Sequence, residues 1–395
     1  MRFTLLPLTR ILGIISLLAW SGSALAAAEI PIGMSTPLES GPVALGQNTR
    51  LGVESYFDSV NRAGGVHGRP LRLLALDDGY EPTKAAVNMR QLIDDKKVLA
   101  VIGNVGTPTA VVSAPIANET RTILMGAVTG AGLLRKTPPE RYIFNYRASY
   151  AEETAAMIDG LLGIGIKPKE IAFFTQNDGY GDSGYAGSVA ALKNRGFAEI
   201  DTLAHGRYTR NTTHVEGALA TILDAEVEPR AIIMVGAYPA CAAFIREARK
   251  DLPNALFLNV SFVGSAALAK ALGKDGEGVI VTQVTPALND PMPGVKAYLE
   301  ALRQYRADAK PDFLSLEGYL AARLLVEGIR RSTVSGNPTE DRETLVNTLE
   351  NLRDFDLGIG APVSFSKTDH QASHKVWPTR LVQGEFQPLA WSQLR

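Results

Sequence analysis

Short apolar runs alternate along the chain with segments in which apolar residues recur at helical spacing. Each run is nearly continuous in Val, Ile, Leu and Phe, which is typical of a strand whose sheet is covered by helices on both faces. The runs that predict strands are 29–34, 71–76, 98–103, 122–128, 171–176, 231–237, 256–263 and 278–284. Strands and helices that alternate this often predict parallel sheets with right-handed crossovers.

Helical spacing is clearest in three of the intervening segments. Apolar residues recur at i, i+3, i+4 and i+7 over 53–60, before Gly64 and Gly65 end the element. A second helix is predicted from Pro82, and a long third one over 315–331 carries an apolar stripe that we expect to pack on the first part of the chain. Two apolar stretches around Gly384 predict a C-terminal hairpin.

The series of strands divides into two sets, so we predict an α/β protein with two lobes. The first set ends near residues 147–153 and the chain returns near 282–288, which implies more than one crossing between the lobes. The expected division is 29–149 for the first part of lobe 1, 150–283 for lobe 2, and 284–395 for a return to lobe 1, with room for part of this tail to cross to lobe 2. Without its first 28 residues the chain retains 395 − 28 = 367, more than one hydrophobic core usually serves.

The first 28 residues have the three-part pattern of a secretory signal peptide. A basic start precedes an apolar run over 11–20, which is too short to span a bilayer, and small residues follow with cleavage predicted after Ala26 or Ala28. Cys241 is the only cysteine, so no intramolecular disulfide can form. Export without disulfides favours a large bacterial periplasmic protein over a small secreted domain.

Composition and charge narrow the class of partner. Apolar residues make up 46% of the chain and charged residues 21%, which describes an ordinary globular protein. The 40 basic residues are balanced by 41 acidic ones, so no basic surplus indicates a nucleic-acid partner or an anionic membrane surface. We expect a small-molecule ligand.

Ligands of open α/β sheets collect at the carboxyl ends of the strands, where this chain carries small and hydroxyl residues. In 103–110, Thr107 and Pro108 begin a helix whose free N–H groups favour an anion such as a carboxylate. The alternative is that Thr107 only caps its own helix. Thr129, Gly130 and Ala131 follow the adjacent strand and support the anion interpretation. Neither stretch matches a Walker loop, which disfavours a nucleotide phosphate.

Aromatic side chains in or beside the strand-end loops could surround the apolar part of a ligand. They are Tyr150, Tyr180, Tyr238 and Phe262. Packing in the core is the alternative for each of them taken singly.

Several ordered motifs together resemble a known family. They are SGPVALGQ (40–47), NRAGGVHGRPLRLLALDDGYEP (61–82), IGNVGTPTA (102–110), FNYRASYAEE (144–153) and QNDGYGDSGYAG (176–187). Over the whole mature chain they are similar to the periplasmic leucine/isoleucine/valine-binding proteins that serve ABC importers. The resemblance implies the type I periplasmic binding protein fold, with two Rossmann-like lobes joined by a multi-strand hinge and closing on the ligand.

The resemblance also suggests roles for particular residues. Thr107 would contact the ligand α-carboxylate, Thr129 and Ala131 would make the neighbouring contacts, and Tyr150 and Tyr238 would face the ligand from the hinge and the second lobe. It implies a branched-chain or other apolar amino acid as ligand, an inner-membrane permease with its ATPase as partner, a monomer, and no cofactor or metal.

One position departs from the family pattern. The acidic residue that pairs with the ligand ammonium falls at Ser261, next to Phe262. Because an enclosed ammonium needs a charge partner or several acceptors, this departure leaves two possibilities open. Asp178 or another acid could substitute, or the ligand could be an aromatic or aliphatic acid without an amine. A periplasmic sensor is a separate alternative, because the same fold also binds ligands for regulators and receptors.

Two other site types are disfavoured. GDSG (181–184) matches the core of a serine-protease signature, but catalysis by Ser183 needs histidine and aspartate partners that an α/β scaffold does not offer in that geometry. His370 and His374 are four residues apart, but they lie in a predicted loop, and we expect surface histidines there.

Overall fold

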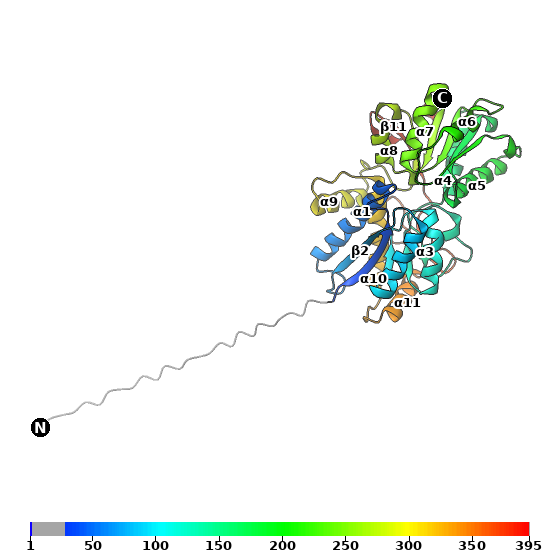
Figure 1. The fold of residues 1–395 in the computed structure, drawn as a ribbon. Helices are drawn as coiled ribbons and strands as arrows, with labels where there is room; N and C mark the ends of the chain where they lie inside the picture. The colour runs from blue at the N-terminus through cyan, green and yellow to red at the C-terminus, as the bar shows by residue number, and fades with distance from the viewer. Residues whose placement is uncertain (2–27, 395) are drawn as a thin grey trace.

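The computed structural model describes Met1 and residues 28–394, which form two α/β lobes (Figure 1). The predicted signal peptide and its cleavage after Ala26 lie outside the described residues, apart from Met1 and Ala28. Among residues 28–394, no helix has the length and apolar composition needed to cross a membrane.

The sheet of lobe 1 has five strands, and all of its pairings are parallel. In spatial order they are β2 (Leu71–Asp77), β1 (Ile30–Thr36), β3 (Ala100–Ile102), β4 (Ile123–Met125) and β5 (Ile143–Phe144). The predicted strands of this half are confirmed. β5 escaped prediction because it contributes only two residues.

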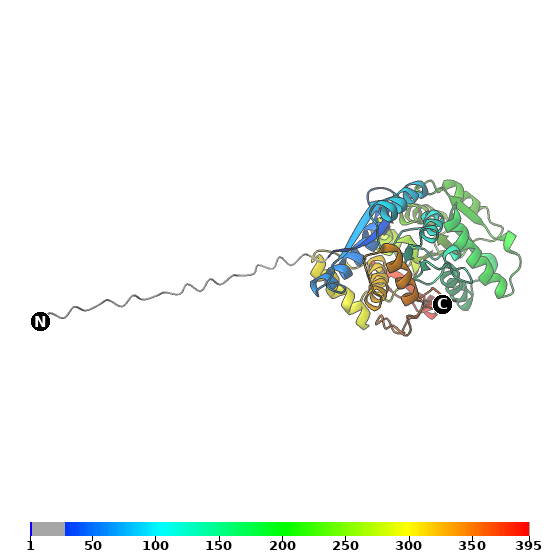
Figure 2. The same ribbon diagram turned by 90° about the horizontal axis from the view of Figure 1, so that it is seen from below.

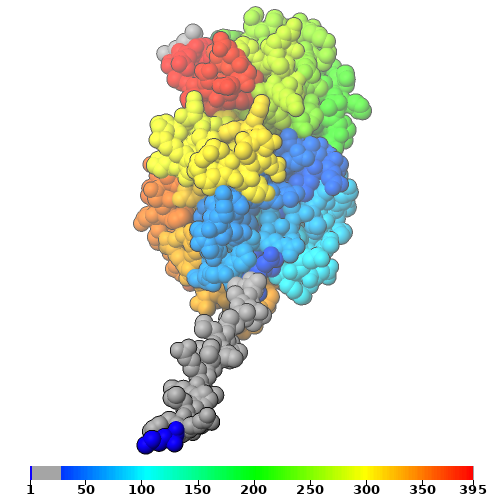
Figure 3. All heavy atoms as spheres, turned by 90° about the vertical axis from the view of Figure 1, so that its left-hand side faces the viewer, coloured from blue at the N-terminus to red at the C-terminus, as the bar shows by residue number. Residues whose placement is uncertain are grey.

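The sheet of lobe 2 has seven strands and mixes both pairings. In spatial order they are β12 (Glu385–Pro388), β11 (Trp377–Val382), β10 (Ile280–Gln283), β9 (Leu256–Val260), β8 (Ala231–Val235), β6 (Ile171–Gln176) and β7 (His205–Tyr208). The predicted C-terminal hairpin is β11–β12, which joins this sheet antiparallel to β10. Figure 3 shows the end of the chain, in red, packed against the green residues of lobe 2.

Eleven α-helices cover the two sheets within the described residues. In lobe 1 they are α1 (Val43–Arg62), α2 (Pro82–Arg90), α3 (Thr107–Glu119), α9 (Pro293–Tyr305), α10 (Phe313–Arg331) and α11 (Pro338–Leu349). In lobe 2 they are α4 (Tyr150–Gly163), α5 (Gly179–Asn194), α6 (Glu216–Leu223), α7 (Tyr238–Asp251) and α8 (Ser265–Leu272). α1 begins at Val43, so the motif quoted over 40–47 is helical from its fourth residue on.

The long helix α10 returns to lobe 1 and packs against α1, as its apolar stripe predicts (Figures 1 and 2). Glycines make this close approach possible. A Cβ at Gly52 would lie 1.8 Å from the Ser315 carbonyl oxygen, and a Cβ at Gly318 would lie 2.4 Å from that of Thr49. Two chain segments about 260 residues apart therefore share one core.

Three chain segments connect the lobes, and hydrogen bonds tie them together. The first is 145–149, the second follows β10, and the third precedes β11. Tyr146 Oη donates to the Val284 carbonyl at 3.1 Å, and Asn145 forms a parallel bridge with Gln371. The boundaries at 149/150 and 283/284 stay a prediction, because the connecting segments belong to neither sheet.

One surface prediction is wrong. His370 is 3% exposed, and its ring stacks on Phe144 with centroids 4.0 Å apart. Its Nδ1 lies 2.9 Å from the Ile143 carbonyl oxygen, so the ring anchors the 366–374 segment to lobe 1. His374 is exposed as predicted, and residues 28–394 contain no group of His, Cys, Asp and Glu suited to a metal ion.

Candidate functional site: the boundary between the lobes

The hydroxyls of Thr107 and Thr129 meet at the carboxyl ends of β3 and β4. Both residues are fully buried, and their Oγ1 atoms lie 2.6 Å apart. The N-cap of α3 is Gly106, with no side-chain cap, so Thr107 does not cap its own helix. Pro108 occupies the first turn, where it removes no helical hydrogen bond. The two hydroxyls sit at the helix N-terminus where an anion is favoured.

The loop after β4 is held in a fixed conformation. Ala131 N–H donates to Thr129 Oγ1 at 3.2 Å, and the Gly130 carbonyl accepts from Tyr150 N–H at 2.8 Å. A Cβ at Gly130 would lie 2.5 Å from Tyr150 N, so only glycine fits there. The Arg135 guanidinium donates to the carbonyls of Thr129 and Ala131 at 3.2 and 3.0 Å. Thr129 can therefore donate to Thr107 while it accepts from Ala131, which leaves the Thr107 proton free for a ligand.

Four aromatic rings from both lobes form a fully buried cluster beside these hydroxyls. Tyr150 lies 5.3 Å from Tyr180, Tyr180 lies 4.6 Å from Phe262, and Phe262 lies 5.9 Å from Tyr80, between ring centroids. Tyr80 comes from lobe 1 and Phe262 from lobe 2, so the cluster spans the boundary between the lobes. Burial raises the pKa of Tyr150 to about 12, which keeps its hydroxyl a donor.

The predicted aromatic residues are not all in this cluster. Tyr238 begins α7, is half-buried, and packs against two apolar clusters, one within lobe 2 and one with residues from both lobes. Tyr180 takes a central place in the cluster although the sequence offered it only as one of four candidates. Tyr80 was missed altogether, and its position just after β2 was the available signal.

Ser261 is bonded to an acid that the sequence did not single out. Glu153, on the first turn of α4, is fully buried, and its carboxylate accepts from Ser261 N–H at 2.7 Å and from Ser261 Oγ at 2.9 Å. Thr282 Oγ1 donates to the same carboxylate at 2.7 Å. Burial raises the pKa of Glu153, and the Arg147 charge and these hydrogen bonds only partly offset that effect.

A buried ion pair connects the first crossing segment to α10. Arg147 donates from Nε and Nη2 to the two carboxylate oxygens of Glu317, at 2.8 and 2.7 Å. Both side chains are at most 3% exposed. Burial opposes the charge of Arg147, but the Glu317 carboxylate holds its pKa above the ordinary value. Arg147 Nη1 has no hydrogen-bond partner among the described residues.

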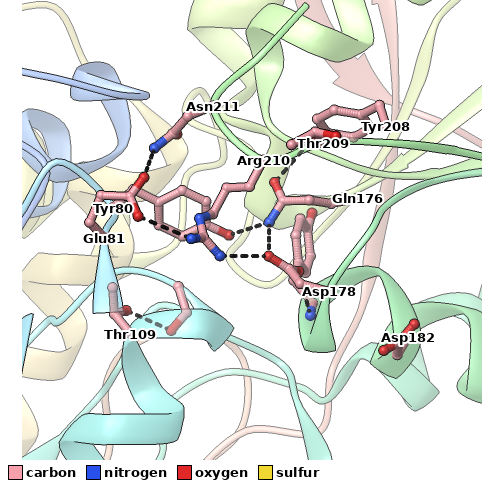
Figure 4. A network of polar contacts seen from close by, with 12 residues as sticks. Tyr80, Glu81, Thr109, Gln176, Asp178, Asp182, Tyr208, Thr209, Arg210 and Asn211 are labelled. Atoms are coloured by element: carbon pink, nitrogen blue, oxygen red, sulfur yellow. Dashed lines mark hydrogen bonds and ion pairs between the residues drawn. The ribbon is translucent and has the colours of Figure 1, made fainter. Parts of the chain in front are cut away.

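At the rim of the boundary, the loop after β7 reaches across to lobe 1 (Figure 4). Arg210 bridges Glu81 of lobe 1 at 3.0 Å and Asp178 of lobe 2 at 3.1 Å. Asn211 Nδ2 donates to Glu81 Oε1 at 2.6 Å and to the Gly79 carbonyl at 3.2 Å. These contacts, which we call the rim latch, join the two lobes at the rim.

A second cross-lobe bond lies behind the rim latch. Gln176 Nε2 donates to Tyr80 Oη at 3.1 Å and to Asp178 Oδ2 at 2.8 Å, and Tyr208 Oη donates to Gln176 Oε1 at 3.0 Å. Asp178 also caps α5 through the N–H of Tyr180. The aromatic cluster and the rim latch are thus parts of one network.

A cavity of about 280 Å³ opens between the lobes next to the rim latch. Gly41 and Pro42 line it from lobe 1, and Tyr208, Asn211 and the start of α7 line it from lobe 2. A larger hollow of about 680 Å³ lies on lobe 1 between α1 and β2, and neither of the two cavities is lined by the predicted site residues. The smaller cavity is the better candidate because both lobes line it.

Comparison with known proteins identifies the family. A model of the periplasmic binding protein family matches residues 29–385. The chain belongs to this family. As a member it is a solute-binding protein and not an enzyme, and Ser183 accordingly makes an ordinary helical contact to the Gly179 carbonyl.

Similar proteins cover almost the whole chain. The crystal structure of a possible leucine/isoleucine/valine-binding protein from Rhodopirellula baltica is 45% identical, with a TM-score of 0.90 over 94% of this chain and 99% of that one. A substrate-binding periplasmic protein from Ralstonia solanacearum is 29% identical, with a TM-score of 0.80 over 89% and 97%. The Leu/Ile/Val-binding protein homolog 3 of Brucella melitensis is 24% identical over 92% of this chain and 95% of its own length. The predicted type I fold is confirmed.

Proposed function

We propose that the protein is the exported solute-binding component of an ABC importer and captures a small carboxylate-bearing ligand between its lobes. A branched-chain or other apolar amino acid is the proposed ligand, and a membrane permease with its ATPase is the proposed partner. The names of the Brucella melitensis and Rhodopirellula baltica relatives support this choice.

One observation carries the proposal. The paired hydroxyls of Thr107 and Thr129 lie at the N-terminus of α3, which favours a carboxylate, and they adjoin an aromatic cluster that favours an apolar side chain. The hydroxyls belong to lobe 1 and the cluster has rings from both lobes, so a ligand that contacts the hydroxyls and the lobe 2 rings stabilises the closed arrangement by its differential affinity.

A thermal-shift screen against amino acids and small carboxylic acids tests the proposal. A ligand at 100 times its Kd stabilises the folded state by about 2.7 kcal/mol. Ligand recovered from the purified protein is expected by mass spectrometry to be chemically unchanged. Recovery of a converted product, or the absence of a shift with every amino acid and carboxylic acid, contradicts the proposal.

Export is tested separately. We propose that the mature protein resides in the periplasm and begins after Ala26 or Ala28. N-terminal sequencing of the protein from a periplasmic extract is expected to begin at Ala27 or Glu29. An intact N-terminus starting at Met1 contradicts this part alone and leaves ligand capture standing.

A further inference from the structure

Glu153 is a buried carboxylate without a counter-ion. It is fully buried, and it forms no ion pair with any Lys, Arg or His of residues 28–394. Among the charged groups, Arg147 lowers the pKa of Glu153 the most, but the Arg147 guanidinium already pairs with both oxygens of Glu317. Arg135 also acts on Glu153 only at a distance, because its donors are bonded to backbone carbonyls and to Gln371.

The location of this charge matters as much as its burial. Glu153 lies one helical turn after Tyr150, whose ring is in the aromatic cluster, and its carboxylate is bonded to Ser261, which precedes Phe262 of the same cluster. The acid therefore adjoins the candidate site at the residue where the family resemblance expects a carboxylate. Glu153 belongs to α4, whereas Ser261 lies in the segment after β9.

The carboxylate has one acceptor position that no hydrogen bond among the described residues uses. A carboxylate offers about four acceptor positions, and the three recorded bonds place two donors on Oε2 and one on Oε1. The helix end and the three hydrogen bonds stabilise the negative charge, but none of them supplies the positive charge that a buried carboxylate requires.

We propose that Glu153 is the specificity-determining residue that pairs with a ligand ammonium, so that the site selects amine-bearing carboxylates over the same acids without the amine. This inference rests on the proposed function and decides between the possibilities that Ser261 left open. Ser261 and Thr282 then act as positioning residues, because they fix the carboxylate beside the aromatic cluster.

The first test uses the unmodified protein and matched ligand pairs. L-leucine is compared with 4-methylpentanoate, L-valine with 3-methylbutanoate, and L-phenylalanine with 3-phenylpropanoate, by isothermal titration calorimetry. In the best-binding pair, the amino acid is expected to bind at least about 30-fold more tightly, since a site built for a charged partner leaves that group unpaired with the analogue.

The second test removes the charge. Glu153→Gln is expected to weaken binding of the amino acid at least about 30-fold, while the affinity for the matched acid changes less than about 3-fold. Asp159→Asn is the control, because it removes a carboxylate from the exposed face of the same helix. Circular dichroism and the thermal unfolding midpoint establish that Glu153→Gln is folded.

The possible outcomes distinguish the role of Glu153 from the proposed capture of a carboxylate ligand. Equal binding of both members of a pair by the unmodified protein overturns the role of Glu153 and leaves carboxylate capture intact. Failure of every amino acid and every acid to bind overturns the proposed function itself. If Glu153→Gln does not fold, equal binding of the matched pairs by the unmodified protein still overturns the role of Glu153.

Discussion

Removal of the Arg210 guanidinium is expected to weaken ligand binding without altering either lobe. Arg210→Ala breaks the bridge between Glu81 and Asp178, and it leaves Asn211 as the only remaining rim-latch contact to Glu81. The latch exists only when the lobes are closed, so its free energy adds directly to the affinity for a ligand that requires closure.

The expected loss of binding free energy follows from how far the three side chains are buried. The side chains of Arg210, Glu81 and Asp178 are 25%, 39% and 19% exposed, so solvent screens the pairs in part. Fully exposed pairs contribute about 0.2–1 kcal/mol, and charge-assisted hydrogen bonds about 1.5–3 kcal/mol. An intermediate value of about 1–2 kcal/mol predicts a roughly 5- to 30-fold rise in Kd.

Calorimetry at two salt concentrations measures this effect. The Debye length falls from about 10 Å at 0.1 M salt to about 3 Å at 1 M, so high salt is expected to weaken binding in the unmodified protein more than in Arg210→Ala. Arg207→Ala is the matched control, because Arg207 pairs with Asp182 inside lobe 2. Unchanged affinity in Arg210→Ala, or an equal loss in Arg207→Ala, would refute the latch as a contributor to closure.

Three further predictions concern the Thr107 hydroxyl, the buried Arg147–Glu317 ion pair and the pH dependence of stability. Thr107→Val is expected to weaken the binding of a carboxylate ligand by about 1.5–3 kcal/mol, measured by calorimetry, and to leave the unfolding midpoint unchanged. Glu317→Gln is expected to cost about 3–5 kcal/mol of unfolding free energy in urea titrations, because it leaves the buried Arg147 charge unpaired. Glu152 raises the pKa of His374, so this pair stabilises the fold below pH about 6.5, and the contribution is lost as pH rises through the folded pKa. With His374 59% exposed the effect stays under about 1 kcal/mol, and His374→Ala is expected to flatten unfolding midpoints measured from pH 6 to 8.

The alternation of apolar runs was sufficient to predict the sheets, because strands covered on both faces are apolar throughout. It failed for β7, whose sequence HGRY carries two polar residues, and for the first turns of α1, which follow Pro42 within a stretch that has the composition of a loop. The local sequence pattern cannot distinguish such segments from loops, since tertiary contacts decide their conformation.

The candidate site was predictable in part. Strand ends and family motifs led to Thr107, Thr129 and the aromatic residues, because their positions in the sequence determine which edge of the sheet they share. Glu153 and Arg147 were not singled out, although both lie in the quoted motif FNYRASYAEE. A charged residue in a sequence is normally solvated, and its burial depends on partners as distant as Glu317 and Ser261.

The hairpin β11–β12 has a consequence for biogenesis. β10 obtains its neighbour on one side from residues 377–382, almost 100 positions further along the chain. Lobe 2 therefore cannot complete its sheet while the chain is still being synthesised or moved through the membrane, and the edge of β10 stays open until the last residues emerge. The chain is consequently expected to reach the far side of the membrane unfinished, and to become resistant to proteases only after its C-terminus has been released.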